Sequence, residues 1–251
     1  CPYHNWSYGL DGKLLAVAKP DFEGPIEEFV GSKDELGLLE VPVECFAGFI
    51  FLNPDRHALP LSTFLGEIAG LLAPYRLEEM VPVGLNVRET LECNWKVVMD
   101  AFQEGYHVQA VHPELIDLAD LTFERFSEIG LHGACTVPFL ATEKAGASAE
   151  EEVAMVRGVP LANFPGLAAI YPRFDEIVAS YRGADGKLKF PAGINARSLL
   201  QRATRENWES KGLDVSELTD NQMSDYQFWS FFPNTFFQFG VGDVTFIQAQ
   251  P

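Results

Sequence analysis

The chain has 251 residues, of which 47% are hydrophobic, and a formal net charge of −18 at pH 7. This length is enough for one large or two modest domains with a buried core. The acidic balance argues against a nucleic acid or an anionic membrane surface as a partner, because both would repel the chain. No run approaches the roughly eighteen uninterrupted apolar residues of a membrane span.

The N-terminal segment contains a Cys-x-x-His pair, Cys1 and His4, followed by a predicted hairpin. Asp11-Gly12 is a tight-turn signal between residues 6–10 and 13–18. As bare spacing, the Cys-x-x-His pair fits half of a zinc site or two unrelated surface residues. Residues 20–33 are rich in turn formers and acidic side chains and predict a loop.

Two strands, at residues 38–43 and 46–52, are predicted to complete a small β domain. His57 follows in a polar turn and is interpreted as a solvated histidine. From Leu61 the pattern becomes helical and ends at Pro74, with an apolar face formed by Leu65, Ile68, Leu71 and Leu72. Residues 81–92 alternate in polarity and predict a strand.

The four cysteines, at positions 1, 45, 93 and 135, show no paired disulfide spacing. This pattern favours a reducing cytoplasm as the setting of the protein. Cys45 and Cys93 lie in apolar, strand-like contexts and are expected to be buried thiols. Cys135 also lies in an apolar run, so packing is favoured over a metal role with His132.

Residues 94–114, NWKVVMDAFQEGYHVQAVHPE, are the most informative segment. Read as a helix capped by Asn94, they form one core-facing stripe of apolar side chains: Trp95, Val98, Met99, Phe102 and Tyr106. Asp100, Glu104 and His107 share another face of that helix. Pro113 disfavours the α conformation at His112, so the helix is predicted to end between the two histidines, and His112 can turn back toward His107.

Two imidazoles with carboxylates beside them at a helix end predict a metal site. On spacing alone, a capping or core histidine pair fits equally well. Zinc and non-haem iron both accept two histidines and a carboxylate, so the pair does not identify the metal.

The second half of the chain predicts helices followed by a sheet. Local patterns predict a short strand at 136–140, a mobile loop or short exposed helix at 141–158, a turn at 182–187 and an amphipathic helix at 195–211 capped by Gly212. Strands are expected at 227–232, 236–239 and 244–248, with Asp243 in the turn before the last. The phenylalanines at 228, 231, 232, 236, 237 and 239 fit either a pocket wall or core packing. The fold class is therefore α+β.

Two motifs together resemble a known family. The segment CPYHNWSYGLDGKL is similar to the second ligand loop of a Rieske [2Fe–2S] centre, and NWK…D…EGYH…HPE is similar to the mononuclear-iron motif of Rieske non-haem iron oxygenases. These oxygenases include the large (α) subunits of aromatic ring-hydroxylating dioxygenases. The resemblance is strongest at residues 1–15, 41–54 and 94–114. It implies a partial Rieske domain at residues 1–56 and a helix-grip (START-like) catalytic domain with an antiparallel sheet at 57–251.

The resemblance also implies roles for individual residues. Cys1 and His4 would hold the [2Fe–2S] cluster, and His107 and His112 a mononuclear Fe(II). Glu104 would link the iron site to the cluster histidine of a neighbouring subunit, and Asp100 would support the site. The upstream Cys-x-His loop is missing, and the carboxylate ligand to the iron is expected beyond residue 251. We therefore read the chain as an inactive internal fragment of a longer protein.

The function that the resemblance implies is hydroxylation of an organic, aromatic substrate with O₂, by either monooxygenation or dioxygenation. Electrons would come from NAD(P)H through a reductase, a ferredoxin or both, and the assembly would be a homotrimer or an α/β hetero-oligomer. Two alternatives remain open. One is a Rieske-type electron carrier without a second iron, and the other is a non-catalytic helix-grip ligand-binding protein.

Overall fold

The computed structural model describes residues 1–17, 32–83, 86–116, 118, 125–139, 146–240 and 243–250. The chain divides into two compact units, Cys1–Leu61 and Ser62–Pro251. The loop predicted at residues 20–33 lies mostly outside the described residues. No helix among these residues is long and apolar enough to cross a membrane.

The described residues of the first unit include two short antiparallel hairpins. The first pairs β1 (Ser7–Tyr8) with β2 (Leu14–Ala16), and Gly12 has the positive φ of +79° that the predicted tight turn requires. A short 3₁₀ helix, η1 (Lys33–Leu36), precedes the second hairpin.

The second hairpin pairs β3 (Val43–Phe46) with β4 (Phe49–Leu52). The predicted strands at 38–43 and 46–52 are therefore displaced, because the chain reverses at Ala47 and Gly48, which both have positive φ. Cys45 lies on the exposed side of this two-stranded ribbon, so the expectation that it is buried is wrong.

The helical segment that begins at Leu61 is broken into α2 (Leu61–Leu65) and α3 (Glu67–Leu72). The break is at Gly66, whose φ of +53° is incompatible with a continuous helix. Of the predicted apolar face, Leu65, Ile68 and Leu72 are buried, whereas Leu71 is exposed. The short 3₁₀ helices η2 (Ala73–Tyr75) and η3 (Leu77–Glu79) follow.

The prediction of a strand at residues 81–92 is wrong. The described residues of this segment, 81–83 and 86–92, form no strand. Val83 and Val87 are exposed. Alternation produces a strand only where a neighbouring strand satisfies its backbone groups. Cys93, in the loop that follows, is exposed rather than buried.

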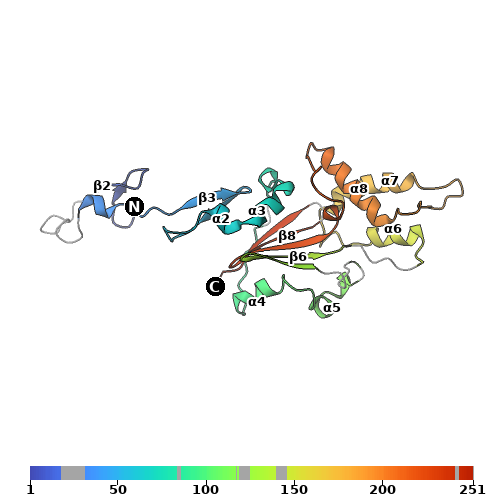
Figure 1. Ribbon diagram of the computed structural model, residues 1–251, viewed down its shortest axis with the longest axis horizontal. Helices are drawn as coiled ribbons and strands as arrows, with labels where there is room; N and C mark the ends of the chain where they lie inside the picture. The colour runs from blue at the N-terminus through green and yellow to red at the C-terminus, as the bar shows by residue number, and fades with distance from the viewer. Residues whose placement is uncertain are drawn as a thin grey trace. The chain divides into compact units, whose positions relative to one another are not determined.

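A five-stranded antiparallel sheet is the centre of the second unit (Figure 1). Its strands, in order across the sheet, are β5 (Arg125–Ile129), β6 (His132–Val137), β7 (Tyr226–Phe231), β8 (Thr235–Phe239) and β9 (Val244–Gln248). The last three match the predicted strands to within one or two residues at each end. β6 begins earlier than predicted, and β5 was not predicted.

Side chains of β7 and β8 are buried on both faces of the sheet. Phe236 contacts Phe102 with 4.1 Å between ring centroids, whereas Phe239, which faces the other way, contacts Tyr75 at 4.5 Å. Most of the phenylalanines in this region are thus core residues, and Phe232 is exposed.

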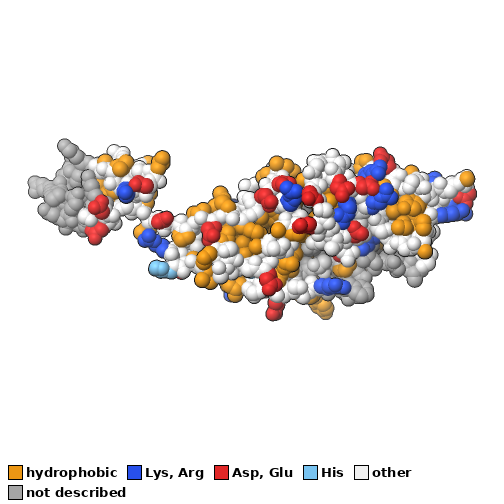
Figure 2. All heavy atoms as spheres, turned by 45° about the horizontal axis from the view of Figure 1, so that its top comes forward, with side chains coloured by type: hydrophobic (Ala, Val, Ile, Leu, Met, Phe, Trp, Pro, Cys, Tyr) orange, Lys and Arg blue, Asp and Glu red, His pale blue; other side chains and the backbone are white. Residues whose placement is uncertain are grey.

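Three helices lie at one end of the sheet: α6 (Ala149–Arg157), α7 (Leu167–Ala179) and α8 (Ala196–Glu209) (Figure 1). They share a core in which Ile170, Phe174 and Leu200 are fully buried. The predicted helix at 195–211 is confirmed as α8, and Gly212, just after it, has a positive φ. α7 was not predicted. Figure 2 shows acidic and basic side chains interspersed over this end of the molecule.

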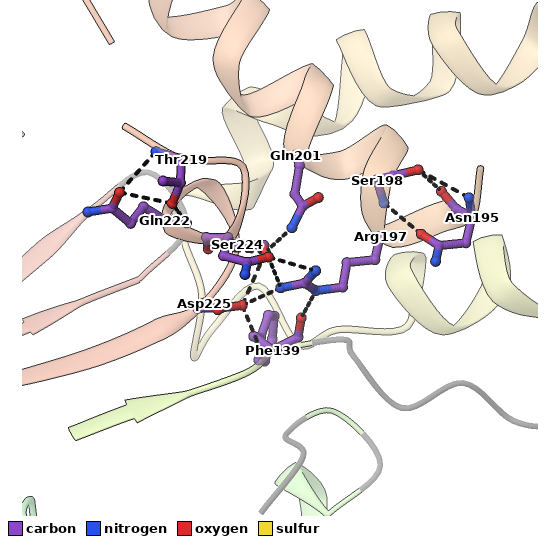
Figure 3. Close-up of polar contacts among 10 residues, drawn as sticks. Phe139, Asn195, Arg197, Ser198, Gln201, Thr219, Gln222, Ser224 and Asp225 are labelled. Atoms are coloured by element: carbon purple, nitrogen blue, oxygen red, sulfur yellow. Dashed lines mark hydrogen bonds and ion pairs between the residues drawn. The ribbon is translucent and has the colours of Figure 1, made fainter. Parts of the chain in front are cut away.

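A buried polar network joins α8 to the end of β6 and the start of β7 (Figure 3). Arg197 donates from Nη2 to Asp225 Oδ1 at 2.5 Å and from Nε to the carbonyl of Phe139 at 3.0 Å. Gln201 donates to Ser224 at 2.9 Å, and the Ser224 hydroxyl lies 3.3 Å from Asp225 Oδ1. A buried carboxylate requires such partners, so the network holds these three elements in one arrangement.

Candidate metal centre

The segment that carries the predicted metal ligands is attached to the sheet by α4 (Trp95–Asp100). Asn94 caps this helix as predicted, accepting the backbone N–H of Lys96 at 3.0 Å. Met99 is buried against Phe236, and Trp95, Val98 and Phe102 pack around them. The predicted apolar stripe is therefore confirmed for its first four members and fixes this segment on one sheet face.

The helix is shorter than predicted. It ends at Asp100, and a second short helix, α5 (Val108–Val111), lies between the two histidines. Asp100, Glu104 and His107 consequently do not share a face of one helix, and Tyr106 is exposed instead of buried in the core. Gly105 disfavours a continuous helix, and the Glu104 side chain offers the His107 N–H an alternative acceptor.

The two histidines nevertheless lie close together, as expected. The backbone of His112 has φ −125° and ψ 59°, outside the α region, as its position before Pro113 predicts. Its ring centroid is 5.5 Å from that of His107, with an angle of 73° between the ring planes. Both rings are partly exposed.

Glu104 holds His107 at two points. Its Oε1 lies 2.5 Å from Nδ1 of the imidazole, and its Oε2 accepts the backbone N–H of His107 at 3.1 Å. Partial burial raises the pKa of Glu104, but the hydrogen bonds from His107 outweigh it and lower the pKa overall. An ionised Glu104 favours a proton on Nδ1, which leaves the lone pair of Nε2 available to a metal.

A second carboxylate lies beside the second histidine. Oε1 of Glu114 is 3.5 Å from Nδ1 of His112. Glu114 belongs to the motif, but no role was predicted for it. Its place two residues after a candidate ligand was the signal available in the sequence. Each imidazole thus has a carboxylate on its Nδ1 side, an arrangement typical of metal-binding histidines.

The donor set fits part of a non-haem iron site. Imidazole nitrogens such as the Nε2 atoms of His107 and His112 are suitable ligands for Fe(II). Among the described residues, no group of three or more His, Cys, Asp or Glu side chains is placed to hold a metal ion. The two histidines would provide two of the ligands of such a site.

The remaining predicted site residues are not brought into this group. Asp100 is exposed at the end of α4, and in the described part of the chain no hydrogen bond or ion pair joins its carboxylate to Glu104 or His107. Cys1 and His4 belong to the first unit, where both are exposed. His4 lies in the turn at residues 2–4, and the Cys1 amino group donates to the carbonyl of Trp6. The cluster role of Cys1 and His4 stays a prediction.

Two supporting residues, Gly133 and His132, were not predicted from the sequence. A Cβ atom at Gly133 of β6 would lie 2.9 Å from Oε1 of Gln103, so this glycine leaves room for the residue next to Glu104. His132 is buried, with Nε2 2.8 Å from the carbonyl of Phe64, and Nδ1 accepts the N–H of Phe232 at 3.2 Å. Both ring nitrogens of His132 are therefore used in joining three segments, which leaves neither for a metal.

A protein-family model matches the chain. The model of the ring hydroxylating alpha subunit (catalytic domain) matches residues 75–251. The match covers most of the chain and includes α4, both histidines and the whole sheet.

Curated relatives of the chain include monooxygenases and dioxygenases. The chain is 34% identical over 117 residues to the glycine betaine monooxygenase oxygenase subunit of Pseudomonas aeruginosa, covering 46% of this chain and 25% of the relative. It is 34% identical over 119 residues to the carnitine monooxygenase oxygenase subunit of Acinetobacter pittii, covering 47% and 30%. It is 36% identical over 119 residues to the large oxygenase component of naphthalene 1,2-dioxygenase of Pseudomonas putida, covering 45% and 25%. The matched part is thus less than a third of each relative.

Comparison with solved structures supports the same fold. The quaternary ammonium Rieske monooxygenase CntA, crystallised with an inhibitor, superposes with a TM-score of 0.53 over 99% of this chain and 46% of that one, at 18% identity. The α+β fold predicted from the sequence is confirmed by this likeness and by the antiparallel sheet.

Proposed function

Because the chain belongs to the family of ring-hydroxylating oxygenase α subunits, we propose that the complete protein is the terminal oxygenase of a Rieske-type system. It would use O₂ and electrons from a ferredoxin, a reductase or both, drawn ultimately from NAD(P)H, to oxidise an organic substrate. The observation that carries the proposal is the pair His107 and His112, each with a carboxylate beside its Nδ1.

His107 and His112 would hold the mononuclear Fe(II). The third ligand would be a carboxylate from outside the described residues. A site with two histidines and one carboxylate leaves positions at the iron open, which suits oxygen activation. Within this chain, Glu104 would keep the proton of His107 on Nδ1 and fix the ring plane. Glu114 would do the same, more weakly, for His112.

Cys1 and His4 would supply two of the four ligands of the [2Fe–2S] cluster. Its histidine ligands replace thiolates and so raise its reduction potential into a range useful for electron delivery. The Glu104 side chain is 41% exposed, so its carboxylate is accessible to a second imidazole donor. This exposure supports a role for Glu104 in linking the iron site to the cluster of a neighbouring subunit in a homotrimer or α/β hetero-oligomer.

The aromatic substrate expected from the sequence is one of two classes that the relatives represent. Naphthalene dioxygenase acts on an arene, whereas the glycine betaine and carnitine enzymes act on quaternary ammonium compounds. Family membership therefore supports oxidation of an organic molecule, by either monooxygenation or dioxygenation.

The test is iron content and low-temperature EPR of the reduced full-length protein, with His107→Ala beside it and His57→Ala as a matched control at an exposed histidine. We expect a Rieske signal plus one further iron per chain, which His107→Ala loses and His57→Ala keeps. A Rieske signal without further iron would identify an electron carrier instead. A complete lack of iron would identify a non-catalytic ligand-binding protein.

A further inference from the structure

The metal segment, residues 94–114, packs against a row of the sheet that ends in two small residues. Gly133 of β6 is paired with Ser230 of β7, which is paired in turn with Phe236 of β8. Residues paired across neighbouring strands point to the same face, so these three form one row on the face that packs against α4. The row has a large ring on β8 and almost no side-chain volume on β6.

Two consecutive residues of the metal segment contact the two ends of this row. The ring centroid of Phe102 lies 4.1 Å from that of Phe236. The side chain of Gln103 lies over Gly133, because a Cβ atom at Gly133 would be 2.9 Å from Oε1 of Gln103. The two ends of the row are two strand spacings apart, about 10 Å. One contact alone would let the segment pivot about the Phe102 ring, whereas two contacts fix its direction.

The Gln103 side chain is held over β6 from within the metal segment. Its Nε2 donates to the carbonyl of Phe102 at 3.0 Å, and its backbone N–H donates to the carbonyl of Asp100 at 2.9 Å. Gln103 is followed directly by Glu104, whose carboxylate orients His107. A displacement of Gln103 is therefore transmitted through the backbone to the group that holds the imidazole.

Gly133 has no conformational reason to be glycine. It lies inside β6 and is not among the glycines with positive φ, so other residues can adopt its backbone conformation. Glycine inside a strand weakens the strand and often marks a place where another part of the chain approaches closely. The part that approaches Gly133 is the amide of Gln103.

We propose that Gly133 is a positioning residue of the candidate metal centre, because it leaves the space on β6 in which Gln103 forms the second anchor of the metal segment. Through Gln103 it fixes Glu104, and through Glu104 it fixes the ring of His107. The proposal rests on the proposed oxygenase function, since it concerns the iron that His107 and His112 would hold.

The test begins with side chains of increasing size at Gly133 in the full-length protein. Gly133→Ala adds a methyl group that a small shift of the flexible Gln103 amide accommodates, so iron affinity should change little. Gly133→Val adds two further methyl groups, which fill the space of the amide, and valine is a favourable strand residue. It should lower iron affinity about tenfold, the lower end of the usual cost of disturbing a residue that orients a metal-binding histidine.

Two measurements report the effect of each variant. Titration of the metal-free protein gives the iron affinity, and EPR of the bound iron with nitric oxide as a probe reports its geometry. Gly133→Val should change both, whereas Gly133→Ala should leave the EPR spectrum nearly as it is in the unmodified protein.

A second background separates positioning from a general effect on the sheet. In protein with Glu104→Ala, Gly133→Val should lower iron affinity no further, because Glu104 no longer transmits the displacement to His107. A purely structural effect would lower iron affinity by the same factor in both backgrounds, and that result would overturn the proposal.

Removal of the Gln103 side chain identifies the contact that is responsible. Gln103→Ala should itself lower iron affinity by a similar factor, because the second anchor is lost, and Gly133→Val should add nothing to that loss. A Cβ atom at Gly133 would also lie 3.1 Å from Oγ of Ser230. If Ser230→Ala restored the iron affinity of the Gly133→Val protein, the contact with Ser230 would be responsible and the proposal would be overturned.

Gln103→Ala also covers the case in which Gly133→Val does not fold. Gly70→Ala, at an exposed glycine of α3 where an added Cβ meets no other part of the chain within 4 Å, is the matched control and should keep the iron affinity of the unmodified protein. Unmodified protein with mononuclear iron, and unchanged iron affinity in the folded variants, contradicts only the role of Gly133. Unmodified protein without that iron contradicts the proposed oxygenase function and the role of Gly133 together.

Discussion

The carboxylate of Glu104 binds His107 both through the imidazole, at 2.5 Å from Nδ1, and through the backbone N–H, at 3.1 Å. One side chain therefore sets both the ring orientation and the start of α5. Two contacts restrict the histidine more than either alone, because the backbone and the side chain can then not rotate independently. Among the described residues other than the two histidines, Glu104 is consequently the one whose loss should disturb the candidate metal centre most.

Replacement of Glu104 by alanine should lower iron affinity by about 10- to 100-fold, the usual cost of losing a carboxylate that orients a metal-binding histidine. Glu104→Gln should lose less, because an amide oxygen still accepts a hydrogen bond from Nδ1–H. The measurement is iron affinity of the full-length protein by titration of the metal-free form. Glu92→Gln, at an exposed carboxylate just before α4, is the control and should match the unmodified protein. Unchanged iron affinity in Glu104→Ala would contradict the orienting role.

Phe236→Ala should destabilise the second unit by about 3–5 kcal/mol, because a fully buried aromatic side chain is lost and a cavity remains. The cavity would lie between β8 and the segment of Met99 and Phe102. The measurement is the free energy of unfolding in urea. Phe126→Ala, at a ring that is 54% exposed on β5, is the matched control and should cost far less. Equal losses for the two variants would show that Phe236 does not anchor α4.

Arg197→Met should cost about 3 kcal/mol, because it leaves the buried carboxylate of Asp225 without its ion pair. The side chain of Asp225 is only 7% exposed, so water cannot replace the guanidinium. Lys189→Met, in an exposed pair with Asp185, should change stability by no more than about 0.5 kcal/mol. Thermal unfolding of both variants gives the comparison. A small effect at Arg197 would indicate that the network in Figure 3 contributes little to stability.

Asp243 should make stability depend on pH in the direction opposite to most carboxylates. Burial raises its pKa in the folded state, although the N–H of Gly166 partly opposes this. The folded state therefore binds the proton more tightly than the unfolded chain. The resulting stabilisation of the folded state is complete at pH values below the pKa of Asp243 in the unfolded chain, near 3.8. It is lost as pH rises through the higher pKa of Asp243 in the folded state.

Asp243→Asn removes this dependence while its side-chain oxygen can still accept the Gly166 N–H. The free energy of unfolding of the variant minus that of the unmodified protein should thus be larger at pH 7 than at pH 3.5. Urea unfolding of both proteins at the two pH values measures the difference. An identical pH dependence in the two proteins would show that the carboxylate is as well solvated when folded as when unfolded.

Local sequence signals predicted several elements well. The structure agrees with the strands predicted at 236–239 and 244–248, with the helix predicted at 195–211 and with the non-helical backbone predicted for His112 before Pro113. Each of these features depends on residues a few positions apart, so the local sequence is sufficient to predict it. α7 was not recognised, and Pro172 inside it is a residue that usually marks the end of a helix.

By itself, the sequence determined the family, the α+β fold class and the ligand candidates His107 and His112, because motif and periodicity are local properties of the chain. Only the tertiary structure decided that the motif helix ends at Asp100, that Cys45 and Cys93 are exposed, and that Asp243 lies beside Tyr226. The helix is held by packing on Phe236, which is more than a hundred residues away in the chain. Such contacts depend on which elements meet across the core, and local patterns do not specify them.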